Sequence, residues 1–194
     1  MRTIFEGKTT IWKEFARATG GRFVEGHSWH SDRTEIEHKD WLVVFDHYTL
    51  WSGKHNQQMT RVIAPLVSLD NFQFEIYRAG LARKIEKLFG GQDVAIGYPE
   101  FDKAFIIKAN NELKIKSFLR NKNIRDSIAL QKEVNILMSD QKGIWEEKLP
   151  KNHFELSFFL DGSVEDIALL KSLLDLFKEM IDELYQLQSI APKA

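Results

Sequence analysis

Between Thr34 and Tyr77 the chain carries a series of strand-like segments that are joined by short polar loops. The stretch from Trp41 to Phe45 is apolar at every position, which indicates a strand that is buried on both faces. Further along, Phe72, Phe74 and Ile76 alternate with polar residues, as in a strand with one buried face. Because strands that follow one another through short loops pair as hairpins, this region predicts a meander of antiparallel strands.

A wide apolar stripe near the C-terminus predicts an amphipathic helix. Its residues recur at spacings of three and four and are Ile167, Leu170, Leu174, Phe177, Ile181 and Leu184, with Leu173, Met180 and Leu187 at the margins. We expect Ser163 to cap this helix, with Asp166 three residues later as in a capping box. So wide a stripe is typical of a helix that lies across a sheet. A self-associating surface is the alternative interpretation.

Shorter elements complete the expected order. Helices are expected over Thr10–Thr19, which Gly20-Gly21 ends, over Leu81–Phe89, and after Asn110 or Asn111, where the triplet 121–123 bends or splits the helix. Strands are expected over Arg22–Gly26, Met59–Ala64 (ended or bulged by Pro65), Ala104–Lys108, Val134–Met138, Ile144–Lys148 and His153–Leu160, with a loop over Gln92–Glu100. Such an order predicts one α+β domain over residues 1–194, a mainly antiparallel sheet with amphipathic helices packed over one face.

The composition restricts the partners that the chain can have. Lys and Arg total 27 against 28 for Asp and Glu, so the basic excess that is usual in nucleic-acid-binding proteins is missing and no nucleic acid is expected. Because there is no cysteine, disulfides, thiolate zinc sites and thiol catalysis are excluded. The first residues lack the apolar region of a signal peptide, and no apolar run approaches the roughly 20 residues of a membrane span. These features predict a soluble, cytoplasmic protein.

No catalytic signature occurs in the sequence. Phosphate-binding glycine loops, the serine-hydrolase nucleophile motif and the paired zinc-binding histidine motif are all missing, so we expect no cofactor and do not favour an enzyme. The densest group of possible metal ligands is the segment from His27 to Asp32, with Glu35, Glu37 and His38 after it. Its candidate ligands are His27, His30 and Asp32, but a metal site needs ligands that converge from rigid elements, and this stretch is typical of a surface hairpin, so we expect no metal. Asp46 and His47 are neighbours on a strand, so they point to opposite faces, and we expect one of them to lie toward solvent.

The most distinctive stretch runs from residue 89 to residue 108. It contains a glycine-ended helix, an acidic residue, a glycine, a Phe-Asp pair, and an aromatic residue with an apolar pair before lysine, at Asp93, Gly97, Phe101-Asp102, Phe105 and Lys108. With these residues the chain resembles bacterial domain-of-unknown-function families. The resemblance implies a shared fold unit of bacterial type and no particular reaction.

The same residues have a structural and a functional interpretation. In the structural one, which we favour, the two phenylalanines anchor the segment to the core, the aspartates accept backbone N–H groups at turns, and the glycine adopts a positive φ. In the functional one, the segment is an anion- or peptide-binding loop. Its candidate ligand-binding residues are then Asp93, Asp102, Lys103 and Lys108.

Basic residues gather mildly between Leu113 and Lys132. They are Lys114, Lys116, Arg120, Lys122, Arg125 and Lys132. Only Phe118 lies near them, so the interleaved aromatic residues that stack RNA bases are missing. A solvated helix face is the favoured interpretation, and docking to an acidic partner or a membrane surface is the alternative.

Three functions remain open at this point. The missing catalytic signatures favour a binding or regulatory module that acts through an unknown protein partner or as a homodimer. A small-molecule or lipid carrier, with an apolar cavity between the sheet and the C-terminal helix, is the first alternative. An enzyme with a dispersed site involving His27, His30 or Asp102 is the second.

Overall fold

The computed structural model describes residues 10–27, 31–52, 55–80, 92–143 and 147–192. Its helices are α1 (Ile11–Thr19), α2 (Pro99–Ala104), α3 (Glu112–Phe118), α4 (Lys122–Leu130) and α5 (Ile167–Gln186). Its strands are β1 (Arg22–Val24), β2 (Arg33–His38), β3 (Trp41–Ser52), β4 (His55–Ser68), β5 (Phe74–Arg78), β6 (Gln92–Asp93), β7 (Phe105–Ala109), β8 (Asn135–Ser139), β9 (His153–Asp161) and β10 (Ile190–Ala191). The expected helix Leu81–Phe89 lies outside the described residues, as do residues 144–146 of the expected strand Ile144–Lys148.

The strands form one large sheet in the order β1-β2-β3-β4-β9-β8-β5-β7-β6, and β10 adds to β4. Every pairing within it is antiparallel, including those of β4 with β9 and of β5 with β8, which are distant in sequence. An antiparallel sheet with five helices confirms the predicted α+β class.

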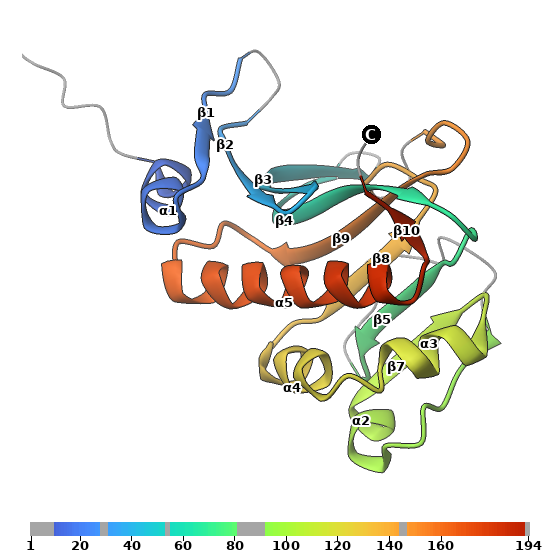
Figure 1. Ribbon diagram of the computed structural model, residues 1–194. Coiled ribbons are helices and arrows are strands. Elements are labelled where there is room, and N and C mark those ends of the chain that lie inside the picture. The colour runs from blue at the N-terminus through green and yellow to red at the C-terminus, as the bar shows by residue number, and fades with distance from the viewer. Residues whose placement is uncertain (1–9, 28–30, 53–54, 81–91, 144–146, 193–194) are drawn as a thin grey trace, which may run out of the picture.

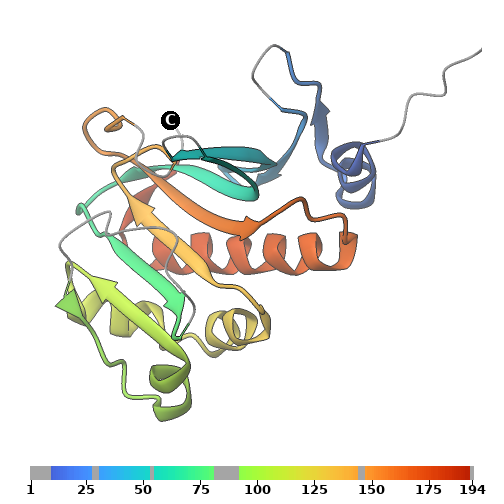
Figure 2. The same cartoon turned by 180° about the vertical axis from the view of Figure 1, so that it is seen from behind.

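Helix α5 runs along one face of this sheet, as Figure 1 shows and as Figure 2 shows from behind. Alternate residues of β9 turn to this face, and Phe154, Leu156 and Phe158 are buried there. Eight residues of α5 are buried as well, seven of them from the predicted stripe, and Phe177 and Leu184 have no exposed surface. Helices α1, α2 and α3 pack on the same face, since their buried aromatic side chains contact core-facing residues of β3, β5 and β7. Helix α4 packs against α5. The predicted placement of helices over one face is confirmed.

The predicted end of one strand and the predicted start of one helix are wrong. Strand β4 does not end at Pro65 but continues to Ser68. Pairing with β3 stops at Ile63, while β9 still pairs with Pro65, so the proline occupies a part of β4 that has no β3 neighbour and tolerates a missing N–H. Helix α5 is capped by Asp166, whose carboxylate accepts from Ala168 N at 2.8 Å, and not by Ser163.

The start of α5 is displaced by a contact with β4. The hydroxyl of Thr60 donates to Gly162 O and accepts from Val164 N, both at 2.9 Å. These bonds hold residues 162–164 in a non-helical conformation, so the helix begins only after the next capping side chain. Local capping preference is overridden here by a tertiary contact.

The region after β6 contains one more helix than expected. Helix α2 lies partly in the expected loop Gln92–Glu100 and carries Pro99 in its first turn, where a fixed φ favours helix initiation. The predicted cap and the predicted split of the next helix are both confirmed. Asn111 accepts from Lys114 N to cap α3, and Asn121 accepts from Asn123 N to cap α4. Among the described helices, none is long and apolar enough to cross a membrane.

Candidate functional site

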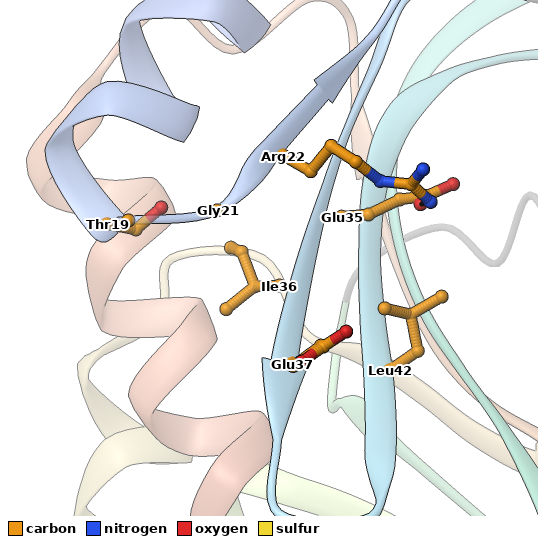
Figure 3. Close-up of a pocket in the computed structure, with 8 residues that line it drawn as sticks. Thr19, Gly21, Arg22, Glu35, Ile36, Glu37 and Leu42 are labelled. Atoms are coloured by element: carbon orange, nitrogen blue, oxygen red, sulfur yellow. Dashed lines mark hydrogen bonds and ion pairs between the residues drawn. The ribbon is translucent and has the colours of Figure 1, made fainter.

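One cavity of about 330 Å³ lies where α1 ends against β2 (Figure 3). It is lined by Thr19, Gly20, Gly21, Arg22, Glu35, Ile36, Glu37 and Leu42. The backbone is tightly packed at Gly21, because a Cβ there would lie 2.7 Å from Ile36 Cγ1 and 2.9 Å from Glu35 O. This glycine therefore joins α1 to the sheet at a distance that a side chain would not allow.

The charges in this first cavity neutralise one another. Glu35 is buried and bonds to Arg22, which lies beside it in Figure 3, and to Arg33 at 2.7 Å. Burial raises the pKa of the Glu35 carboxyl, but the hydrogen bonds and charges of Arg33 and Arg22 outweigh burial and hold that pKa below its ordinary value. Because the Glu35 carboxylate is already paired with two arginines, few of its hydrogen-bond acceptors remain for a ligand. This cavity is therefore a weak candidate for a binding site.

A second cavity, of about 360 Å³, lies between α2, α4 and the end of β5. We name it the arginine–aromatic cleft. Its lining residues are Arg78, Tyr98, Glu100, Phe101, Ala104, Phe105, Arg125, Asp126 and Ala129. They come from the distinctive stretch 89–108, from β5 and from the basic cluster, which are separate in sequence.

The distinctive stretch shapes the aromatic side of this cleft. The Asp102 carboxylate accepts from Ile96 N and from Gly97 N, each at 2.9 Å, and Gly97 has a φ of 86°. These contacts fix the loop that leads into α2 and carries Tyr98. Behind it, the buried rings of Phe101 and Phe105 lie 4.5 Å apart between centroids. The predicted anchoring by the phenylalanines, the backbone bonds of Asp102 and the positive φ of Gly97 are therefore confirmed.

Two arginines stack on aromatic rings of the cleft. The guanidinium carbon of Arg125 lies 3.6 Å from the centroid of Tyr98, and that of Arg78 lies 4.7 Å from the centroid of Phe105. Cations at these distances are attracted by the ring quadrupole. Nη1 of Arg125 donates to Leu119 O, and Nη2 of Arg78 donates to Gln131 O, so each side chain is also tied to backbone carbonyls at a helix end.

The positive charge of these arginines is not neutralised within the described chain. Among the described residues, neither Arg78 nor Arg125 forms an ion pair. In each guanidinium only one nitrogen, Nη2 of Arg78 and Nη1 of Arg125, donates hydrogen bonds to backbone carbonyls of the described ranges. Of the two lining carboxylates, Asp126 pairs with Lys122 and Glu100 has no ion-pair partner in the described part of the chain. A guanidinium has five N–H donors in a planar fork, so donors remain for an anionic ligand.

The lining of the cleft is made mainly of charged and aromatic side chains. It contains no serine, threonine, histidine or lysine, but Glu100, Asp126 and Tyr98 carry groups that can act as general acids or bases. Its chemistry is that of two cations, two carboxylates and a wall of aromatic rings. Guanidinium N–H groups are donors that form charge-assisted, often bidentate hydrogen bonds with carboxylates and phosphates.

None of the four sequence-predicted ligand residues lines this cleft. Asp102 supports the loop from behind, and Lys103 is exposed on α2. Asp93 pairs with Lys108 at 3.3 Å across β6 and β7. Their role in ligand binding stays a prediction. Sequence reasoning missed Arg78 and selected Arg125 only as one member of a basic cluster, because no local pattern links β5 to α4.

The sequence-predicted metal ligands lie apart from the cleft. His27 is exposed with Nδ1 3.1 Å from Glu25 O, and Asp32 accepts from Gly26 N at 2.9 Å. His30 lies outside the described residues. No three histidine, aspartate or glutamate side chains of the described ranges are placed to hold a metal ion together.

The strand neighbours Asp46 and His47 do point to opposite faces, but neither lies in open solvent. Asp46 is buried and pairs with Arg61. The His47 ring packs edge-on against Trp12 of α1 at 4.8 Å, and its Nε2 is buried without a hydrogen-bond partner among the residues that the structure describes. The expectation that one of the pair faces solvent is wrong, because α1 covers His47 and a guanidinium covers Asp46.

We expect the stability of the fold to fall when His47 is protonated. Burial lowers the pKa of His47, and the nearby charges of Asp46, Asp32 and Glu165 only partly oppose this. Because its pKa in the folded state lies below the unfolded value of 6.5, the stabilisation is complete above that pH and is lost as pH falls through the lowered pKa. Urea unfolding from about pH 7.5 to about pH 5 measures this, and His47→Phe, which keeps a ring against Trp12, reduces the pH slope. An unchanged slope in that variant would refute the assignment.

No protein-family model and no curated protein matches the chain. The resemblance over residues 89–108 therefore stays a prediction. Among solved structures, the fold is similar to the crystal structure of the mycobacterial trehalose monomycolate transport factor A, TtfA, with a TM-score of 0.57. The superposition covers 93% of this chain and 96% of that one at 10% sequence identity. At this identity the likeness is one of fold alone.

Proposed function

We propose that this protein is a non-catalytic binding module whose ligand carries an anionic group, held in the arginine–aromatic cleft. One observation carries the proposal: Arg78 and Arg125 are stacked on aromatic rings and have no carboxylate partner among the described residues. Stacking fixes the orientation of each guanidinium before the ligand arrives, so little side-chain freedom is lost on binding.

The size of the cleft supports a small ligand or a head group. Sites for drug-sized molecules usually measure about 300–1,000 Å³, and this cleft is at the lower end with about 360 Å³. A phosphate or carboxylate with a short apolar or polyol extension fits that volume. A bidentate contact from one arginine and a second contact from the other would favour phosphate.

Titration with glycerol 3-phosphate, followed by calorimetry or by the NMR signals of the arginine side chains, tests the proposal. We expect Arg125→Gln to weaken binding by about 10- to 100-fold, the effect of losing charged hydrogen bonds. Glu100→Gln should strengthen binding by roughly threefold, since it removes a nearby like charge from the cleft. Arg17→Gln on exposed α1 is the matched control and should bind as the unaltered protein does.

The outcomes separate a binding site from a purely structural cluster. If Arg125 serves only to tie α3 and α4 together, its replacement lowers stability but Glu100→Gln has no effect on affinity. Absence of binding to the unaltered protein, or equal affinity in the Arg125 and Arg17 variants, would refute the function.

A small-molecule or lipid carrier is the second candidate function. It is supported by the similarity in fold to the mycobacterial trehalose monomycolate transport factor A, TtfA. Neither cavity described above lies between the sheet and α5, so the cleft is the place where we would locate the cargo. Mass spectrometry of the gently purified protein should then detect a copurified amphiphile, and Arg125→Gln should remove it. A binding module that acts through a protein partner or a second copy would carry no such cargo.

A further inference from the structure

The rim of the arginine–aromatic cleft bears a large, exposed apolar side chain. Leu130 is 80% exposed at the end of α4. It follows Ala129 directly and stands one helical turn beyond Asp126, and both of these residues line the cleft. Tyr98, whose ring carries the Arg125 guanidinium, is also exposed, at 36%. An apolar rim therefore borders the two unneutralised arginines.

We propose that this rim docks on an anionic membrane surface, with a lipid phosphate in the cleft. The inference rests on the proposed function, because the same arginines hold the phosphate. Leu130 would then enter the boundary between head groups and acyl chains, where Tyr98 also fits with its ring apolar and its hydroxyl wet. The exposed Lys132, two residues after Leu130, adds positive charge next to it.

The exposed leucine beside the arginines favours a lipid surface over a free anion. An exposed leucine contributes nothing to the binding of a soluble phosphate. In a lipid, by contrast, the phosphate and the apolar acyl chains are joined in one molecule. The apolar side chain of Leu130 therefore matches the acyl chains, which are the part of a lipid next to its phosphate. The contact would be peripheral, since no helix among the described residues is long and apolar enough to cross the bilayer.

Vesicle flotation tests this inference with the full chain. Vesicles of phosphatidylglycerol and phosphatidylcholine in equal amounts are compared with vesicles of phosphatidylcholine alone. We expect binding to the anionic vesicles only, weakened by added salt. Leu130→Ser should reduce the vesicle partition coefficient by about tenfold. Leu113→Ser is the matched control, because Leu113 is also 80% exposed but stands at the start of α3, outside the cleft lining.

The soluble probe separates the failure of this inference from the failure of the proposed function. Leu130→Ser should bind glycerol 3-phosphate as the unaltered protein does, while Arg125→Gln should lose both the probe and the vesicles. If the probe binds through Arg125 but vesicles do not bind, the membrane inference is wrong and the binding function stands. Equal vesicle partition of the Leu130 and Leu113 variants also overturns the inference. If neither probe nor vesicles bind, both proposals fall.

Discussion

Replacement of Phe177 by alanine is expected to lower the free energy of unfolding by about 3–5 kcal/mol. Phe177 has no exposed surface and lies in the middle of α5, within the core cluster between this helix and the sheet. Removing the ring loses its transfer free energy and leaves a cavity that neighbours on a rigid helix and sheet fill only partly. Against a typical total of about 5–15 kcal/mol, this is the largest loss that we expect from one apolar side chain in α5.

Denaturation in urea or guanidinium measures this effect. The midpoint concentration of denaturant should fall, while the slope of the free energy of unfolding against denaturant concentration stays unchanged. Lys171→Ala is the matched control, because Lys171 is exposed on the same helix and its replacement should change stability by less than about 0.5 kcal/mol. Similar losses in the two variants would mean that α5 does not cover the sheet through its apolar stripe.

The stripe of α5 could be predicted because its signal is local. Residues at spacings of three and four must share a helix face, and a face that carries Leu170, Phe177 and Leu184 must be covered. The start of the same helix could not be predicted. Ser163 and Asp166 are both good caps, and the choice between them depends on Thr60, which β4 brings against residues 162–164.

In the candidate site, too, the local features could be predicted from the sequence and the tertiary contacts could not. The aromatic wall and the role of Asp102 follow from turn chemistry within one stretch, so the sequence predicts them. The positions of the two arginines could not be predicted, because Arg78 ends β5 and Arg125 lies on α4. Only the tertiary fold brings them to the rings of Phe105 and Tyr98. The basic cluster between Leu113 and Lys132 also carries less unpaired positive charge than its sequence suggests. Lys114, Lys116 and Lys122 are paired with carboxylates, which leaves Arg125 as its cation in the cleft.

The second large effect concerns an ion pair on the sheet face opposite α5. Arg61 donates to Asp46 through Nε at 2.9 Å and through Nη2 at 2.6 Å, and the two side chains are only 13% and 11% exposed. The ring of Tyr48 lies 4.8 Å from the same guanidinium. Register places Asp46 directly opposite Arg61 on β3 and β4, so the backbone itself sets this bidentate geometry.

We expect Asp46→Leu to lower the free energy of unfolding by about 3–5 kcal/mol, because it removes the carboxylate from a guanidinium that stays largely desolvated. The double replacement Asp46→Leu/Arg61→Leu should cost less than Asp46→Leu alone. It removes both desolvation penalties, and the nearby Leu50, Met59 and Phe159 supply apolar neighbours for the new side chains. Denaturation of the two single variants and the double variant gives the coupling free energy from a double-mutant cycle. Strictly additive losses would show that the pair is not coupled, and the buried charges on this face would then have to be stabilised by other groups around each of them.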